Sequence, residues 1–102
     1  MKRTIVALAL GLSLLNAAPV QAGGAIESAC NSSDRPGRSR ALCDCIQKVA
    51  DSVLSNSEQR RGAKFFKDPH EAQVVRMSAS SSDSEFWQKW RLFGATAEKY
   101  CQ

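Results

Sequence analysis

The chain has 102 residues, four cysteines and a formal net charge of +4. A chain of this length holds one domain with a modest hydrophobic core, and such cores are commonly reinforced by disulfides. Lys2 and Arg3 supply two of the positive charges, so the remainder carries a net charge of only about +2. Such a charge predicts no nucleic acid or other polyanion as a partner.

The first predicted element is a signal peptide over residues 1–22. Two basic residues precede an apolar run at 5–15, and a short segment ending at Ala22 has the character of a cleavage site. We therefore expect a mature domain at 23–102 in the periplasm or outside the cell. The apolar run is shorter than the roughly 20 residues that cross a bilayer, and no second run follows it, so no membrane span is expected.

The remaining sequence predicts an all-α fold, a small bundle of about four helices. Strand alternation and hairpin turn pairs are absent, whereas three segments place a capping residue three positions before a glutamate. These segments are Ser55–Glu58, Asp68–Glu71 and Ser82–Glu85. Helices are expected near residues 36–54, 56–67, 69–78 and 83–101, after a short helical turn around Ala25–Cys30.

The helix expected at 36–54 has one apolar face when its residues are projected at about 100° per residue. The centre of that face holds Leu42, Ile46, Val49 and Val53, extended by Ala50 and Leu54, while Arg40, Asp44, Gln47 and Asp51 fall opposite. In the next helix, Ala63 and Phe66 face the expected core and Phe65 lies nearer the basic side. These faces predict which helix surfaces pack together.

The helix expected at 83–101 carries an aromatic face that should supply much of the core. This face consists of Phe86, Trp90, Phe93, Ala97, Tyr100 and Cys101, with Trp87 and Gly94 at its rim. Because the aromatic side chains are needed to fill the interior, we interpret Trp87 as a core residue rather than a ligand anchor.

The four cysteines, Cys30, Cys43, Cys45 and Cys101, predict two disulfides in an oxidising compartment. Two steps along a helix place Cys43 and Cys45 about 160° apart, so their thiols point in different directions. A bond between these two residues is therefore excluded. Each joins either Cys30 or Cys101, and the sequence leaves both of these pairings open.

Candidate catalytic chemistry is weak in this sequence. The Cys43–Cys45 pair lacks the Cys-x-x-Cys spacing and the neighbouring strands of a typical redox motif. His70 is the sole histidine, and no serine or cysteine has an identifiable base partner. We expect no catalytic residues, no metal site and no cofactor.

The helix expected at 56–67 carries a basic stripe formed by Arg60, Arg61, Lys64 and Lys67. These four residues fall within about 120° of one another on a helical projection. The stripe is a candidate surface for an anionic envelope component or an acidic protein, and the alternative is an ordinary solvated helix face.

Four segments together resemble a family of short exported proteins from alphaproteobacteria. The segments are SACN (28–31), RALCDCIQ (40–47), QRRGAKFFKDPHEAQ (59–73) and FWQKWRLFGATAEKYC (86–101). Some members of that family carry the label arginine transporter. The resemblance implies a periplasmic location and a shared fold, and it supplies no catalytic residues.

The sequence thus favours a non-enzymatic periplasmic or secreted module that binds an unknown protein or envelope component, with its oligomeric state open. One alternative is an accessory role in arginine transport, although a carrier needs several spanning helices and a two-lobed binding protein needs a longer chain. A second is a thiol-disulfide oxidoreductase that uses Cys43 and Cys45. A third is carriage of a small ligand or lipid between the aromatic helix and the helix at 36–54.

Overall fold

The structure, a computed structural model, describes residues 24–102; the expected signal peptide at 1–22 lies outside the described residues. The described chain is all-α, as predicted, and has no strand. Its helices are α1 (Gly24–Asn31), α2 (Arg40–Val53), α3 (Asn56–Lys67), α4 (Pro69–Arg76) and α5 (Ser81–Tyr100). The short turn expected before the bundle is a complete helix, α1, which packs against α2 and α3.

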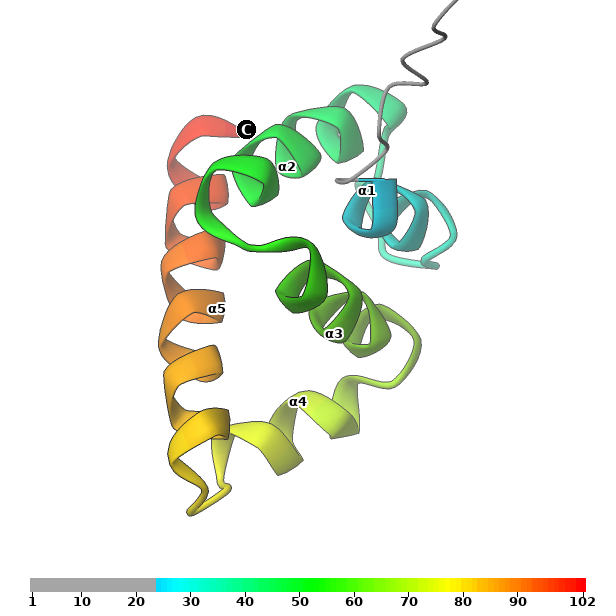
Figure 1. The fold of residues 1–102 in the computed structure, drawn as a ribbon. Coiled ribbons are helices and arrows are strands. Elements are labelled where there is room, and N and C mark those ends of the chain that lie inside the picture. Colours follow the sequence, from blue (N-terminus) through cyan, green and yellow to red (C-terminus); the bar gives the residue numbers. More distant parts are fainter. Residues whose placement is uncertain (1–23) are drawn as a thin grey trace, which may run out of the picture.

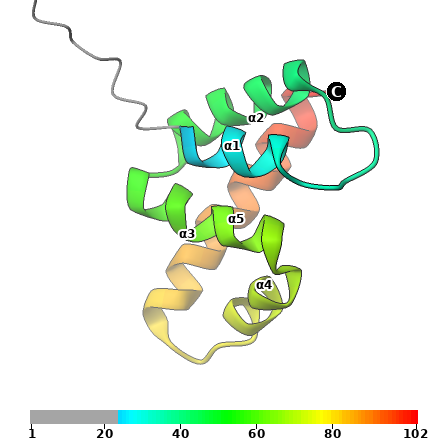
Figure 2. The same ribbon diagram turned by 90° about the vertical axis from the view of Figure 1, so that its right-hand side faces the viewer.

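Helix α5 runs the length of the molecule along one side, and the other helices lie across from it (Figure 1). Helix α1 packs against α2 and α3, α2 packs against α5, and α4 joins α3 to α5. In the view turned by 90°, α5 passes behind α2 and α3, while α4 lies at the far end from α2 (Figure 2). No helix between residues 24 and 102 combines the length and the apolar character that a bilayer crossing requires.

Serine side chains cap the starts of α2, α3 and α5. Ser55 and Glu58 form the predicted reciprocal capping box at the start of α3. Helix α5 begins earlier than expected, because Ser80 rather than Ser82 caps it by accepting a hydrogen bond from the Asp83 N–H. Asp68 makes no side-chain cap at the start of α4, where Pro69 occupies the first turn instead.

The start of α2 differs most from the sequence-based expectation of residue 36. Arg35–Arg38 form a turn in which the Arg38 N–H donates to the Arg35 carbonyl oxygen at 3.4 Å. Gly37 has a φ of +78°, and Pro36 precedes it, as in a type II β-turn. Ser39 then caps α2 by accepting from the Leu42 N–H at 3.1 Å. The helix therefore starts at Arg40.

The core consists of two clusters. The larger holds Ile26, Val49, Ala50, Leu54 and Phe93 and joins α1, α2 and α5. The smaller holds Phe65, Val75 and Phe86, with Trp87 packed against it, and joins α3, α4 and α5. Trp90 packs against both clusters and so connects them.

Two assignments on the aromatic residues were wrong. Phe65, expected nearer the basic side of α3, is buried against Phe86 and Trp90 of α5. Ala63 and Phe66 pack against the larger core cluster, as expected. The Phe65 ring centroid lies 5.2 Å from that of Trp90 and 6.0 Å from that of Phe86. Tyr100 is 66% exposed, because it lies at the end of α5 beyond the core.

Gln47 was expected on the solvent side of α2, but it is buried because α1 packs over that side. Its Oε1 accepts from the Glu27 N–H at 2.7 Å, and its Nε2 donates to Gln59 Oε1 at 2.8 Å and to Asp51 Oδ1 at 2.9 Å. Gln59, 1% exposed, also donates to Asp51 at 3.2 Å and to the Leu54 carbonyl at 3.4 Å. These hydrogen bonds satisfy buried polar groups of α1, α2 and α3.

Two disulfides connect the helices, Cys30–Cys43 and Cys45–Cys101. This is one of the two pairings that the sequence left open. Cys30–Cys43 joins α1 to the start of α2, and Cys45–Cys101 joins the start of α2 to the end of α5. The first bridge closes a separation of 13 residues and the second one of 56. By loop-closure entropy these are worth about 3 and about 4 kcal/mol.

Candidate functional site

A pocket with a volume of about 560 Å³ lies between α2, α3 and α5, the position that the sequence suggested for small-ligand carriage. Its apolar walls come from Leu42 and Ile46 of α2, Phe65 and Phe66 of α3, Pro69 and Ala72 of α4, and Trp90, Phe93, Gly94 and Ala97 of α5, together with Cys30 and Pro36. Its polar lining is Ser33, Arg35, Arg38 and Gln73. The volume lies within the range of about 300–1,000 Å³ typical of small-molecule sites.

The pocket explains why part of the predicted apolar face is not fully covered. Leu42 and Ile46 are half-buried, whereas Val49 and Ala50 one turn further along are buried. Phe66, Trp90 and the small residues of α5 border the same space. Half-buried apolar side chains of α2, α3 and α5 therefore meet at one concavity, while the most exposed apolar side chains, Val74, Met77, Leu92 and Tyr100, lie outside it.

The segment between α1 and α2 forms the mouth of the pocket and is held at several points. Ser33 is buried, and its hydroxyl donates to the Cys30 carbonyl oxygen at 2.8 Å. Arg38 Nη1 donates to the Asn31 carbonyl oxygen, and Cys30 is itself in a disulfide. With the turn at Pro36 and Gly37, these bonds fix where the two arginines leave the backbone.

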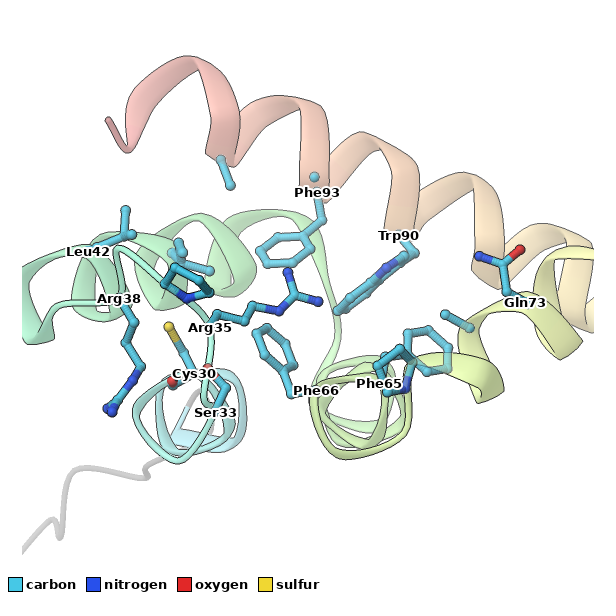
Figure 3. A pocket seen from close by; sticks show the side chains of 16 residues that line it. Cys30, Ser33, Arg35, Arg38, Leu42, Phe65, Phe66, Gln73, Trp90 and Phe93 are labelled. Atoms are coloured by element: carbon cyan, nitrogen blue, oxygen red, sulfur yellow. Dashed lines mark hydrogen bonds between the residues drawn. The ribbon is translucent and has the colours of Figure 1, made fainter.

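Arg35 lies over the pocket. Its guanidinium carbon is 5.3 Å from the centroid of the Phe66 ring, a cation–π arrangement. Figure 3 shows the Arg35 side chain reaching over Phe66 in the direction of Phe93 and Trp90, whereas Arg38 is directed away from them. Neither arginine was predicted as a site residue. Pro36 and Gly37 are typical of a turn, and Ser39 is a typical helix cap, so the sequence did indicate a loop at this position.

Trp90 forms one wall of the pocket. Its ring fits against α3 because residue 62 is a glycine and has no side chain. A Cβ atom at residue 62 would overlap the six-membered part of the Trp90 indole. The ring also packs 4.9 Å, centroid to centroid, from Phe93. The position of this wall therefore depends on a residue that is itself outside the pocket.

The charge of the pocket has one sign. Within residues 24–102, the lining includes two arginines and no aspartate or glutamate, and no ion pair among these residues involves Arg35 or Arg38. A cationic ligand therefore finds no counter-charge in the lining.

The predicted basic stripe is divided by the fold. Arg61 pairs with Asp83 of α5, and its guanidinium carbon lies 4.5 Å from the Phe86 ring centroid. Hydrogen bonds from Ser78 and Arg61, and the charge of Arg61, hold the pKa of Asp83 below its usual value. Arg60, Lys64 and Lys67 remain exposed. Arg61 thus joins α3 to α5, and three of the four expected residues form the solvent-facing stripe.

The other chemical candidates lie apart from the pocket. Cys43 and Cys45 belong to different disulfides, so a dithiol exchange between them needs both bridges to open. His70 is exposed on α4. In the part of the chain that the structure describes, no three His, Cys, Asp or Glu side chains gather as a metal site would require.

Comparisons of this chain with protein-family models, with curated proteins and with solved structures found no match. The pocket and its lining are therefore the basis on which a function is proposed.

Proposed function

We propose that this chain is a non-enzymatic binding module of an oxidising compartment, and that it holds a small molecule with an apolar body in the pocket between α2, α3 and α5. The observation that carries this proposal is a cavity of about 560 Å³ whose lining is mainly apolar and aromatic side chains from α2, α3 and α5. Two disulfides in a small chain support a location outside the reducing cytosol.

The sequence also favours a binding module, but it suggested the basic stripe of α3 as the binding surface, whereas the proposed surface is the pocket. A binding site needs a concave apolar surface with few, fixed polar groups, and the pocket has both. The exposed stripe of Arg60, Lys64 and Lys67 has neither a concavity of comparable size nor a partner from α5.

Titration with the neutral fluorescent probe N-phenyl-1-naphthylamine tests the proposal. We expect saturable binding at one site, with at least about tenfold weaker binding in Ala97→Phe, since a Phe side chain at residue 97 occupies the apolar volume. Ala95→Phe is the matched control, because Ala95 is exposed on α5 and does not line this pocket.

Circular dichroism and thermal melting of both variants establish that each is folded. Equal probe affinity in the two variants, or no saturable binding by the unmodified chain, would overturn the proposal. Native mass spectrometry of protein isolated from the periplasm complements the titration by revealing any copurified mass.

A further inference from the structure

We propose that the ligand carries an anionic head group, a carboxylate in the simplest case, on its apolar body, and that Arg35 binds that head. This inference rests on the proposed function, because it names the ligand chemistry of the same pocket. Three observations support it: the placement of Arg35, the charge of the lining and the origin of both lining arginines in one segment beside the aromatic walls.

The first observation is that Arg35 is held in place without a counter-charge. The Arg35–Arg38 turn fixes its backbone, and the face of the Phe66 ring receives its guanidinium at 5.3 Å. An aromatic face orients a guanidinium but leaves its N–H donors available, and these donors match the two oxygens of a carboxylate. Arg35 is therefore a pre-positioned donor at the pocket mouth.

The second observation is that two cations without an ion pair line the pocket, whereas three other cations are paired on the surface. Arg61 pairs with Asp83, Lys89 pairs with Glu58 at 3.4 Å, and Lys48 pairs with Asp44 at 3.0 Å. Within the described residues, Arg35 has no such partner, and Arg38 donates one N–H to a main-chain oxygen. Among the cations without an ion pair in the described residues, Arg35 and Arg38 are the two that line the pocket.

The third observation is the distribution of polarity along the pocket. Both charged side chains of the lining, Arg35 and Arg38, come from the segment between α1 and α2, and Arg35 reaches toward Phe66 and Phe93. The uncharged Gln73 lies at the other end of the pocket (Figure 3). An amphipathic anion with its head at the segment and its apolar body against the rings satisfies both parts. Free arginine also carries a carboxylate, but it lacks an apolar body and would place its own guanidinium group against the aromatic walls.

Competition of decanoate, decan-1-ol and decylamine against N-phenyl-1-naphthylamine, each below its aggregation concentration, tests the inference. The three compounds share a ten-carbon chain and differ in head charge. We expect decanoate to bind about tenfold more tightly than decan-1-ol, in line with one charge-assisted hydrogen-bonded contact, and decylamine to bind most weakly. High salt should reduce the advantage of decanoate.

Arg35→Gln should remove the advantage of decanoate over decan-1-ol while leaving decan-1-ol binding unchanged. Arg35→Lys should restore part of the advantage, because it returns the charge without the planar fork. Arg91→Gln is the control for net charge, since Arg91 is exposed on α5 and lies outside this pocket.

The outcomes separate the two proposals. Equal binding of decanoate and decan-1-ol, tighter binding of decylamine, or an unchanged preference in Arg35→Gln overturns the anionic head and leaves the binding module intact. Failure of all three compounds and of the probe to bind overturns both. Melting curves show whether Arg35→Gln is folded, and Arg35→Lys gives a second test at the same residue.

Discussion

At the scale of single residues, two helical glycines occupy opposite environments. Gly62 of α3 faces the Trp90 indole so closely that a Cβ would overlap the ring, whereas a Cβ at Gly94 of α5 would meet nothing within 4 Å. The same substitution therefore changes the stability of the protein in opposite directions at the two positions.

Gly62→Ala should lower the free energy of unfolding by about 1–3 kcal/mol, because the added methyl displaces Trp90 from a packed wall. Gly94→Ala should raise it by about 0.5–1 kcal/mol, because alanine loses less conformational entropy in a helix. Urea unfolding of both variants measures the two changes, and a loss of stability in Gly94→Ala would contradict the open environment of that position.

Gln47 is a buried polar residue whose side chain serves three hydrogen-bond partners on three helices. Gln47→Ala leaves the Glu27 N–H and Gln59 Oε1 without these bonds, so we expect a loss of about 1–3 kcal/mol in the free energy of unfolding. Thermal melting measures it against Gln88→Ala, a control on the exposed side of α5 whose effect should stay within about 0.5 kcal/mol.

Two carboxylates couple folding to pH. Burial raises the pKa of Glu58, but hydrogen bonds from Ser55 and the charge and hydrogen bond of Lys89 outweigh it, so its pKa lies below the ordinary 4.5. The pKa of Asp83 lies below its ordinary 3.8, chiefly through Ser78 and Arg61. A lowered folded-state pKa contributes stability above the unfolded-state pKa, and this contribution disappears as the pH falls through the folded-state value.

We therefore expect the melting temperature to fall on acidification below about pH 4.5. The fall should be shallower in the double variant Glu58→Gln, Asp83→Asn, in which glutamine keeps the capping geometry without the charge. Glu71→Gln is the control, because Glu71 is exposed and joins no ion pair among the described residues. An acid dependence as steep in the double variant as in the unmodified chain would contradict this coupling.

At the scale of helices, the two disulfides differ in access to solvent. Cys43 is fully buried and Cys30 is 5% exposed, whereas Cys45 and Cys101 are both half-buried. Thiolate attack needs access to sulfur, so the Cys45–Cys101 bridge should be reduced first.

Partial reduction with a mild thiol, followed by alkylation and peptide mapping, checks this order. We expect label at residues 45 and 101 while 30 and 43 remain oxidised. The Cys45→Ser, Cys101→Ser variant is the control, since it should take up no label under the same conditions. Early label at Cys43 would contradict the burial of the first bridge.

The helices were predictable where local signals decide them. The Ser55 capping box and Pro69 each mark a helix start that the structure has. Neighbouring serines within one segment compete as caps, which is why the cap at Ser80 was assigned to Ser82. The turn formed by Pro36 and Gly37 was predicted to be helical, because the apolar periodicity of α2 does not define the residue at which the helix begins.

The site was less predictable, because it depends on which faces the helices present to each other. The projection identified the apolar face of α2 correctly but could not tell that Leu42 and Ile46 border a cavity while Val49 is covered. Phe65 and Phe66 both pack against the core, Phe65 in the smaller cluster and Phe66 against the larger one, whereas a projection with a single apolar face buries only one of them. Arg35 lies in a loop, where no periodicity indicates its direction.

At the scale of the whole molecule, covalent and packing restraints are unevenly distributed. Both bridges attach to the first two turns of α2, near the larger core cluster. Helix α4 is held at the other end by the smaller cluster, in which Val75 is its buried contribution. Local opening is easiest where few buried apolar contacts hold an element.

Amide hydrogen exchange should therefore be faster in α4 than in α2. Exchange followed by peptide mass spectrometry at neutral pH measures the difference, and α3, which packs against both α1 and α4, is the internal reference. Equal protection of α2 and α4 would show that the small cluster holds its helix as firmly as the bridged one.

The difference in restraint between α2 and α4 has a consequence for which ligands the pocket would accept. The mouth lies beside the Cys30–Cys43 bridge, whereas Pro69, Ala72 and Gln73 of the untethered α4 form part of the opposite wall. We therefore expect the wall that α4 supplies to move more readily than the wall beside the bridge. The pocket would then discriminate between ligands by their head group and would tolerate apolar bodies of different length.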